Sequence, residues 1–387
     1  MDNPRVLVPV LNPLGGIRTY MLYNLKSLYN EGYRFTFLSG TSGAFDTFKQ
    51  DLTDWEDTDF VEFPPGRNRK IIFSVIRQTL RERSFQLIHS QGLQMGTITA
   101  AANFFRRVPH LITLHNVIVP GNEVPGRFKY LKERLISFLT QRTTAIIAVS
   151  DDCLENHIER FPAWQKGPVK LHVIVNGVDT QKLLRSQSDF ETAGTPWIRA
   201  LFGEKSDVFI GGFFGRFMPE KGFETFLQAL TILAARGYKD RIRFVVTRER
   251  NGYLKESIKA VEENPHIAGM IQFIEPFADI APILAQIDFL VNPSLYEACP
   301  ILPMEAMVLG KPVIGSDCIG LREVLRGTPS AAPKKGDAEA LAANFIDFIE
   351  HPAVDAAKNF AEEAKNRFDV RIATDKLLGL YRQYQQE

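Results

Sequence analysis

The sequence predicts an α/β protein of two Rossmann-like domains, each built on a parallel sheet, that face each other across a cleft. Short β-rich runs alternate with amphipathic stretches of helical period, which is typical of parallel strands joined by crossover helices. The chain of 387 residues is too long for one hydrophobic core of ordinary size. Open parallel sheets bind ligands beyond the carboxyl ends of their strands, so we expect the chemistry in the cleft.

The expected strands fall into two series, separated by a polar stretch that contains Gly and Pro. Each strand is a short apolar or β-branched run that ends in polar or glycine-containing residues. The strands are expected at residues 5–11, 34–40, 86–92, 110–116, 145–150 and 170–178, then at 207–215, 242–247, 271–276, 288–294 and 311–316. These runs predict a first domain at 1–178, a linker segment at 179–206, a second domain at 207–365 and a C-terminal helix at 366–387.

The composition is typical of a soluble globular protein, with 45% hydrophobic residues, 24% charged residues and a formal net charge of +1. No apolar run approaches the roughly 18–20 residues that span a bilayer, and no secretory signal is recognised at the amino terminus. The three cysteines, Cys153, Cys299 and Cys318, have no CxxC spacing, which disfavours a disulfide framework or a zinc site. We therefore expect a cytoplasmic protein.

The near-zero net charge conceals a basic region in the first domain. Residues 60–145 contain 13 Lys and Arg against 4 Asp and Glu. The basic residues lie in two helix-like stretches, at 67–83 and 127–142. Solvated helix faces are one interpretation. The other is peripheral contact with anionic lipid headgroups, at the inner face of a membrane, or with a phosphate-bearing acceptor. Nucleic acid is not expected, because no recognition motif accompanies the charge.

A candidate ligand loop follows the first strand, where Gly15 and Gly16 precede a helix. Glycines allow a tight turn and a close approach of the ligand, and a helix amino terminus favours an anion. The pattern is not G-x-G-x-x-G, so a nicotinamide cofactor is disfavoured. A plain tight turn remains the alternative interpretation.

The second series begins with the same construction of strand, loop and helix. Its loop contains Arg216 and Lys221, five residues apart. Arg is a fork-shaped donor and Lys a point charge, so the two together are suited to a diphosphate. Two solvated loop cations are the alternative.

Two glutamates stand in the otherwise apolar stretch "YEACPILPMEAMVLGKPVIGS", at Glu297 and Glu305. Carboxylates seldom lie in such surroundings without a partner. We expect Glu297 in a turn and a helix that begins at Pro300 or Ile301 and stops at Gly310. Glu305 would then lie in the second turn, near enough to the helix start to reach the same ligand. A capping carboxylate and a surface residue are the alternative.

Four stretches together resemble glycosyltransferase family 4, a large group of retaining enzymes with the GT-B fold. "PSLYEACPILPMEAMVLGKPVIGSDCIGLREVL" resembles the E-x7-E region of that family, and "GRFMPEKG" its G-R-x-x-x-x-K-G loop. "VIVNGVD" and "IIAVSDDCLE" resemble two further signatures. They occur in the order and spacing of the family across nearly the whole chain. The resemblance implies a nucleotide-sugar-binding second domain, an acceptor-binding first domain and a C-terminal helix that crosses back to the first domain.

The resemblance also implies roles for single residues. Glu305 matches the glutamate that holds the ribose hydroxyls, and Glu297 the one that bonds the donor sugar. Arg216 and Lys221 match the pair that neutralises the diphosphate. The remaining matches are the helix-start amides of Ile301 and Leu302, the glycine loop at Gly15 and Gly16, and His115, placed near the sugar unless it is structural.

Three positions differ from the family's pattern. The first glutamate is followed by Ala298, Cys299 and Pro300, where the family often has a small residue and then Phe-Gly. The glycine-rich turn after the second strand of the second domain reads "VVTRERNGY", which puts Arg248 near the base or the diphosphate, as a contact or as a block. Ile319 stands where the family usually has glycine.

These observations predict a retaining hexosyltransferase that uses a UDP- or GDP-linked sugar, a hydroxyl acceptor such as a sugar or a lipid-linked one, no metal and no cofactor. No D-x-D pair stands in a suitable loop, and cations and amides can stabilise the leaving diphosphate directly. Retention in the family is ascribed to front-face attack assisted by the leaving phosphate, so no protein nucleophile is assigned. The expected setting is polysaccharide, glycolipid or cell-envelope glycan synthesis. The alternatives are a non-catalytic GT-B protein that binds a nucleotide or a partner and, less favoured, a nucleotide-sugar epimerase.

Overall fold

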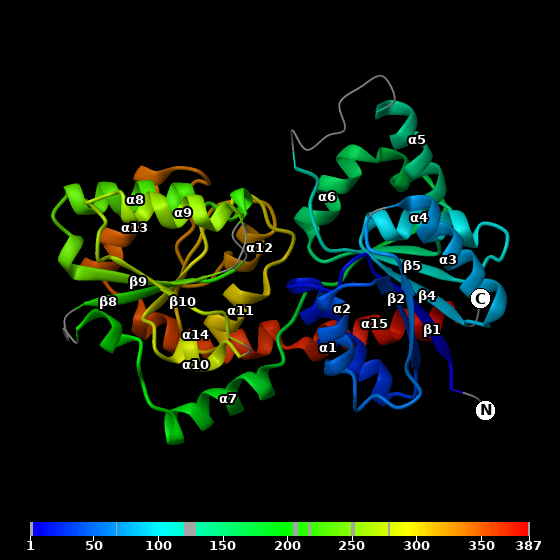
Figure 1. The fold of residues 1–387 in the computed structure, drawn as a ribbon, viewed down its shortest axis with the longest axis horizontal. Helices are drawn as coiled ribbons and strands as arrows, with labels where there is room; N and C mark the ends of the chain where they lie inside the picture. Colours follow the sequence, from blue (N-terminus) through cyan, green and yellow to red (C-terminus); the bar gives the residue numbers. More distant parts are fainter. Residues whose placement is uncertain are drawn as a thin grey trace. The chain divides into compact units, whose positions relative to one another are not determined.

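The computed structural model describes residues 3–66, 68–119, 129–203, 208–215, 218–248, 252–277 and 279–385. The chain forms two compact units, one of Met1–Asn176 with Val370–Glu387 and one of Gly177–Asp369 (Figure 1). We call them unit 1 and unit 2. Each contains one parallel sheet, which confirms the predicted fold of two parallel-sheet α/β domains.

Unit 1 is built on a seven-stranded sheet in the order β3-β2-β1-β4-β5-β6-β7. Six of its strands were expected. The additional strand is β3, an edge strand whose residues are mostly only partly buried, so its sequence lacks a continuous apolar run. The strands are β1 Arg5–Pro9, β2 Arg34–Gly40, β3 Asp59–Phe63, β4 Leu87–Gln91, β5 His110–Leu114, β6 Ala145–Ala148 and β7 Lys170–Val173.

The sheet of unit 1 has a hydrophobic core on each face. Val6 and Val8 of β1 belong to the core beneath α1, α2 and α15, whereas Leu7 belongs to the core beneath α3 and α4. This alternation follows from the two-residue period of a strand. The helices are α1 Gly16–Asn30, α2 Gly43–Asp51, α3 Arg69–Glu82, α4 Leu93–Asn103, α5 Lys129–Thr140, α6 Asp151–Arg160, η1 Pro162–Lys166 and α15 Val370–Tyr384.

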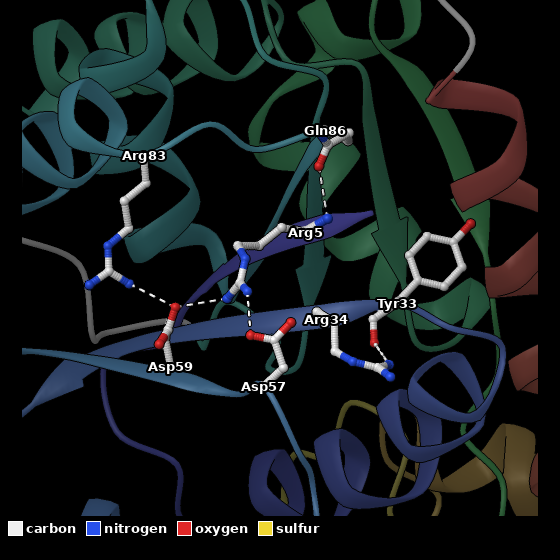
Figure 2. Close-up of polar contacts among 7 residues, drawn as sticks. All are labelled: Arg5, Tyr33, Arg34, Asp57, Asp59, Arg83 and Gln86. Atoms are coloured by element: carbon white, nitrogen blue, oxygen red, sulfur yellow. Dashed lines mark hydrogen bonds and ion pairs between the residues drawn. The ribbon is translucent and has the colours of Figure 1, made fainter. Parts of the chain in front are cut away.

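The amino ends of the strands in unit 1 are joined by an ionic cluster (Figure 2). The guanidinium of Arg5 donates to Asp59 at 2.7 Å and to Asp57 at 2.6 Å, and Arg83 donates to Asp59 at 3.0 Å. The backbone N–H of Arg5 donates to Gln86 Oε1 at 2.8 Å. Ligands of parallel sheets bind at the carboxyl ends of the strands. This cluster lies at the opposite edge of the sheet.

The C-terminal helix α15 packs beside α1 within unit 1, as was expected of a helix that crosses back (Figure 1). Its Tyr381 is fully buried, with the hydroxyl 2.8 Å from Nδ1 of His89 on β4. Nε2 of His89 lies 2.6 Å from Thr113 Oγ1 on β5. The hydrogen bonds thus fasten the last helix to the middle of the sheet.

Unit 2 is built on a five-stranded sheet in the order β10-β9-β8-β11-β12. All its strands were expected: β8 Phe209–Phe213, β9 Ile242–Thr247, β10 Ile271–Ile274, β11 Phe289–Val291 and β12 Val313–Ile314. The helices are α7 Thr180–Ala193, η2 Arg199–Phe202, η3 Pro219–Lys221, α8 Phe223–Ala235, η4 Lys239–Arg241, α9 Gly252–Glu262, α10 Ala281–Ala285, α11 Ile301–Val308, α12 Leu321–Leu325, α13 Ala338–Glu350 and α14 Val354–Phe368.

Helix α7 occupies much of the stretch 179–206, for which the sequence predicted a linker segment. The carboxylate of Asp179 caps the helix by accepting a hydrogen bond from the N–H of Lys182 at 3.0 Å. The helix packs against α10 and α11 of unit 2. Leu183 supplies buried apolar surface, and most of the helix is polar, so its period is weak in the sequence.

We expect the Tyr381→Phe substitution to destabilise unit 1. It would leave His89 Nδ1 buried without its partner, which costs about 1–3 kcal/mol. Calorimetry should show a lower melting temperature for the transition of unit 1. Tyr130→Phe is the matched control, because the Tyr130 side chain is 69% exposed. Equal melting temperatures for both variants would contradict the role of this hydrogen bond.

Acid should destabilise unit 1 more than unit 2. Burial lowers the pKa of His89 and His110 to about 3 in the folded chain, below the unfolded value near 6.5. Between these values the unfolded chain binds more protons, so stability falls as the pH falls from about 6.5 toward 3. At pH 5 each of these two buried groups removes about 2 kcal/mol. The histidines of unit 2, His266 and His351, are exposed.

Calorimetry at pH 7.5 and pH 5 would test this difference. We expect the melting transition of unit 1 to shift down further than that of unit 2. Replacing His110 by Asn should reduce the shift of unit 1. A transition of unit 1 that moves no further than that of unit 2 would contradict the prediction.

Candidate functional site

The order in which strands are added to the sheet of unit 2 reverses between β8 and β11, which are parallel neighbours. It builds outward from β8 to β9 and β10, then returns to place β11 on the other side of β8. Phe213 at the end of β8 is the register partner of Val291 at the end of β11. The loops that leave these two strands therefore begin side by side. Such a reversal is where open parallel sheets bind ligands.

An ion pair joins these two loops. Lys221 Nζ donates to Glu297 Oε1 at 2.6 Å. Lys221 ends the short helix η3 after β8, and Glu297 lies in the loop after β11. The Glu297 side chain is only 11% exposed and that of Lys221 25%. The structure thus brings together two residues that the sequence assigned to one ligand, although they are 76 positions apart.

Ser294 is a third member of this site that the sequence analysis missed. Its fully buried hydroxyl lies 2.8 Å from Glu297 Oε1 and 2.6 Å from Asn292 Oδ1. The single hydroxyl proton can serve one of these oxygens at a time. A polar residue directly after a buried strand, at the carboxyl edge of a parallel sheet, was the available signal.

Backbone contacts hold the two loops in register. Leu295 N–H donates to Glu220 O in the other loop at 2.7 Å, and Glu297 N–H donates to Ile319 O, in the segment after β12, at 3.2 Å. Gly222 has φ 71°, and a Cβ at this residue would lie 2.0 Å from the carbonyl oxygen of Pro293. A residue with a side chain does not fit there without moving the backbone. The close approach of the loops therefore depends on this glycine.

Helix α11 begins at Ile301 and is followed by Gly310 with φ 69°, which confirms the predicted start and stop. Pro300 is the N-cap and Pro303 the third helical residue. Neither proline has an N–H, so the first three positions of the helix offer two amide donors, those of Ile301 and Leu302. Glu305 lies in the second turn, as expected, and is 8% exposed.

Of the two arginines predicted for the site, the structure describes Arg248. Arg216 lies outside the described residues, as do Glu249 and Arg250. Arg248 directly follows β9, is exposed, and its N–H donates to Ile274 O at 2.7 Å. Because β9 adjoins β8, Arg248 stands at the same edge of the sheet as Lys221, one strand away.

Unit 1 has its own reversal, between β1 and β4. Gly15 and Gly16 follow β1, and Gly16 begins α1. Gly15 has φ 57°, a left-handed conformation that favours glycine. A Cβ at Gly16 would meet no atom within 4 Å, so space is open beside the helix start. These features fit a loop that a ligand approaches closely.

His115 follows β5 at the same edge of unit 1. Its Nε2 lies 2.7 Å from Oε1 of Gln91, at the end of β4. Gln91 donates its own amide to His89 O at 3.2 Å, so its oxygen faces His115 and the histidine is the donor. Burial lowers the pKa of His115 to about 3, and the ring is therefore neutral with Nδ1 as its acceptor. Gln91 was not identified from the sequence.

Two features of the described residues bear on cofactors and membranes. Among them, no group of three or more His, Cys, Asp or Glu is arranged to hold a metal ion. Within the same ranges, no helix combines the length and the apolar character needed to cross a bilayer. All three cysteines are buried.

Comparisons with known proteins agree with this arrangement. Residues 14–182 match the model described as Glycosyltransferase Family 4, and residues 209–351 match Glycosyl transferases group 1. The UDP-Gal:alpha-D-GlcNAc-diphosphoundecaprenol alpha-1,3-galactosyltransferase of Escherichia coli is 22% identical, over 97% of this chain and 95% of its own length. The capsular polysaccharide biosynthesis glycosyltransferase CapM of Staphylococcus aureus is 23% identical, over 86% of this chain and 87% of its own length.

Solved structures share the fold. Alr3699/HepE of Anabaena in complex with UDP and glucose aligns with a TM-score of 0.77 and 22% identity, over 97% of this chain and 98% of that one. Sucrose-phosphate synthase of Thermosynechococcus elongatus aligns with a TM-score of 0.73 and 17% identity, over 98% of both chains. With a Glycosyltransferase Family 4 domain in the first half of the chain, a Glycosyl transferases group 1 domain in the second half and this shared fold, the protein belongs to the GT-B glycosyltransferases.

Proposed function

We propose that this glycosyltransferase is a retaining enzyme that moves a hexose-type sugar from a UDP- or GDP-linked donor to a hydroxyl acceptor. The observation that carries the proposal is the Lys221–Glu297 ion pair at the reversal between β8 and β11. The names of two relatives support it. The Escherichia coli relative is named for UDP-Gal and for a diphosphoundecaprenol acceptor, and the CapM relative for capsular polysaccharide. Polysaccharide, glycolipid or cell-envelope glycan synthesis is the corresponding setting.

The leaving diphosphate is the group that the site in unit 2 would stabilise. Negative charge develops on it as the bond to the sugar breaks, and preorganised cations and amides lower that barrier. Lys221 and Arg216 supply the positive charge, and the N–H groups of Ile301 and Leu302 supply donors. The proposed reaction needs neither a metal nor another cofactor, and chelation with EDTA should leave the rate unchanged.

Glu297 changes partner when the donor binds. In the free protein its carboxylate neutralises Lys221 at 2.6 Å. The diphosphate then takes over Lys221, and Glu297, which lies 2.8 Å from Ser294 Oγ in the free protein, accepts hydrogen bonds from sugar hydroxyls. Attack comes from the face of the leaving phosphate, without a protein nucleophile. The ion pair keeps both side chains placed before the donor arrives.

The remaining residues have supporting roles in the proposal. Glu305 holds the ribose hydroxyls, and Arg248 contacts the base or the diphosphate. Unit 1 binds the acceptor, with Gly15 and Gly16 at the donor phosphate and the acceptor. His115, neutral and oriented by Gln91, offers Nδ1 as a hydrogen-bond acceptor near the sugar. The proposed compartment is the reducing cytoplasm, in which buried thiols persist.

We expect Glu305→Gln to weaken the binding of nucleotides. A carboxylate that accepts hydrogen bonds from ribose contributes roughly 1.5–3 kcal/mol, or about 10- to 100-fold in affinity. Calorimetric titration with UDP and GDP measures this change. Glu363→Gln on α14 is the control, because Glu363 is an exposed carboxylate to which the proposal assigns no role. Unchanged affinity for both nucleotides would remove Glu305 from the ribose site.

Lys221→Met should reduce turnover by about 100- to 1,000-fold, as expected for the loss of one preorganised group at a developing charge. The assay measures the nucleotide released from UDP- and GDP-hexoses, with a melting curve as the control for folding.

Glu297→Gln should lose turnover while retaining more nucleotide affinity than Lys221→Met. Nuclear magnetic resonance of the product reads the anomeric configuration, and inversion would contradict a retaining mechanism. Wild-type protein that binds nucleotide without turning over any donor would favour the non-catalytic alternative.

A further inference from the structure

An exposed apolar surface lies on unit 1. Five of its large side chains are at least half exposed. They come from α5 and from the turn that follows α4, namely Phe105 at 87%, Tyr130 at 69%, Leu131 at 64%, Leu135 at 55% and Phe138 at 50%. We call these five residues the apolar patch. Side chains of this kind gathered at one place usually mark an interaction surface.

Helix α5 presents its apolar stripe to solvent. Leu131, Leu135 and Phe138 are spaced four and three positions apart, so they share one face of the helix. In a helix of a globular protein such a stripe normally faces the core. In α5 the fully buried residue is Thr140, at the carboxyl end. Packing against the described residues of unit 1 therefore does not account for the stripe.

The turn after α4 holds Phe105 in solvent. The side-chain amide of Asn103 donates to Val108 O at 2.7 Å and accepts from Val108 N–H at 3.1 Å. Arg107 has φ 56°, which is strained for a residue with a side chain. Two hydrogen bonds and a strained backbone thus fix the turn that exposes the phenyl ring of Phe105. This favours a functional role for the exposed ring.

Phe104 connects this turn to α5. Its ring centroid lies 5.0 Å from that of Phe105 and 6.4 Å from that of Phe138. The guanidinium of Arg142 covers the rings of Phe104 and Phe138, at 4.7 and 5.0 Å from their centroids. The turn and the helix thus form one continuous surface.

The charge around the patch is positive. Lys132 and Arg134 belong to α5, Arg142 follows it, and Arg106 and Arg107 follow Phe105. The acidic residue within α5 is Glu133, and its carboxylate is paired with Arg160 of α6. Among the described residues, an anionic partner would therefore meet net positive charge beside apolar side chains.

Helix α3 has similar charge but a different burial. Its Ile72, Ile76 and Leu80 are buried in the core of unit 1, so its apolar face is covered. Its exposed large apolar residue is Ile71, at 39%. Of the two basic stretches in the sequence, 67–83 therefore exposes charge but covers its apolar face over its described residues, whereas 129–142 combines charge with exposed apolar surface.

We propose that α5 and the turn at Phe105 dock unit 1 onto an anionic lipid bilayer. The apolar patch enters the boundary between headgroups and acyl chains, and the basic residues beside it meet the lipid phosphates. A basic helix that exposes apolar side chains is suited to this role, whereas a flat protein partner would not require the net positive charge. The inference goes beyond the proposed function, because it depends on neither the donor nor the acceptor.

Flotation of the full chain with vesicles tests the proposal. We expect binding to phosphatidylcholine vesicles that contain about 30% phosphatidylglycerol, weak binding to phosphatidylcholine alone, and loss of binding in about 0.5 M salt. Leu131→Gln combined with Leu135→Gln should lower the partition coefficient between vesicles and solution about tenfold. Lys132→Gln combined with Arg134→Gln should lower the partition coefficient by a similar factor.

Matched variants separate this surface from general effects. Ile372→Gln on α15 removes an apolar side chain that is 45% exposed, and Arg77→Gln combined with Arg81→Gln removes charge from α3. Both should bind more tightly than the α5 variants, with melting temperatures equal to that of the wild type. No binding of the wild type to anionic vesicles would overturn the proposal. The proposal would also be overturned if the wild type sedimented as a dimer and the variant with Leu131→Gln and Leu135→Gln as a monomer. The patch would then bind a second copy of the chain.

Discussion

One geometric constraint underlies both candidate sites. In each parallel sheet the first strand lies inside the sheet, because the chain adds strands on one side and then returns to the other. The carboxyl ends of β8 and β11 in unit 2, and of β1 and β4 in unit 1, therefore adjoin. Loops that leave adjoining strands in the same direction can bring distant residues together without a long connection. Lys221 meets Glu297 for this reason. His115 meets Gln91 more simply, because they follow the neighbouring and consecutive strands β5 and β4.

The Lys221–Glu297 pair shows what partial burial adds to this geometry. A carboxylate that is 11% exposed is costly to desolvate alone, so it needs a cation or a hydroxyl beside it. Lys221 and Ser294 meet that need in the free protein. A diphosphate presents the same kind of negative charge to Lys221. The arrangement that makes the loops stable thus also makes the lysine available to an anionic ligand.

The two basic helices of unit 1 show that charge alone does not define a surface. In the sequence, 67–83 and 127–142 have similar patterns of basic and apolar residues. Packing separates them, because α3 covers its apolar stripe against the core and α5 leaves its stripe exposed. The turn at Phe105, which is distant from both in the sequence, joins only the surface of α5.

The sequence by itself determined the elements whose signal is local. It predicted eleven of the strands, the helix between Pro300 and Gly310, and the loops that contain Gly15 and Lys221, because buried parallel strands and helix stops depend on short runs of residues. Strand β3 and helix α7 were missed, since an edge strand and a mostly polar helix lack such runs. Only the tertiary structure decided that Ser294 supports Glu297, that Gln91 orients His115, and that α5 exposes its apolar face. Each of these depends on which elements pack together, and a local pattern does not contain that information.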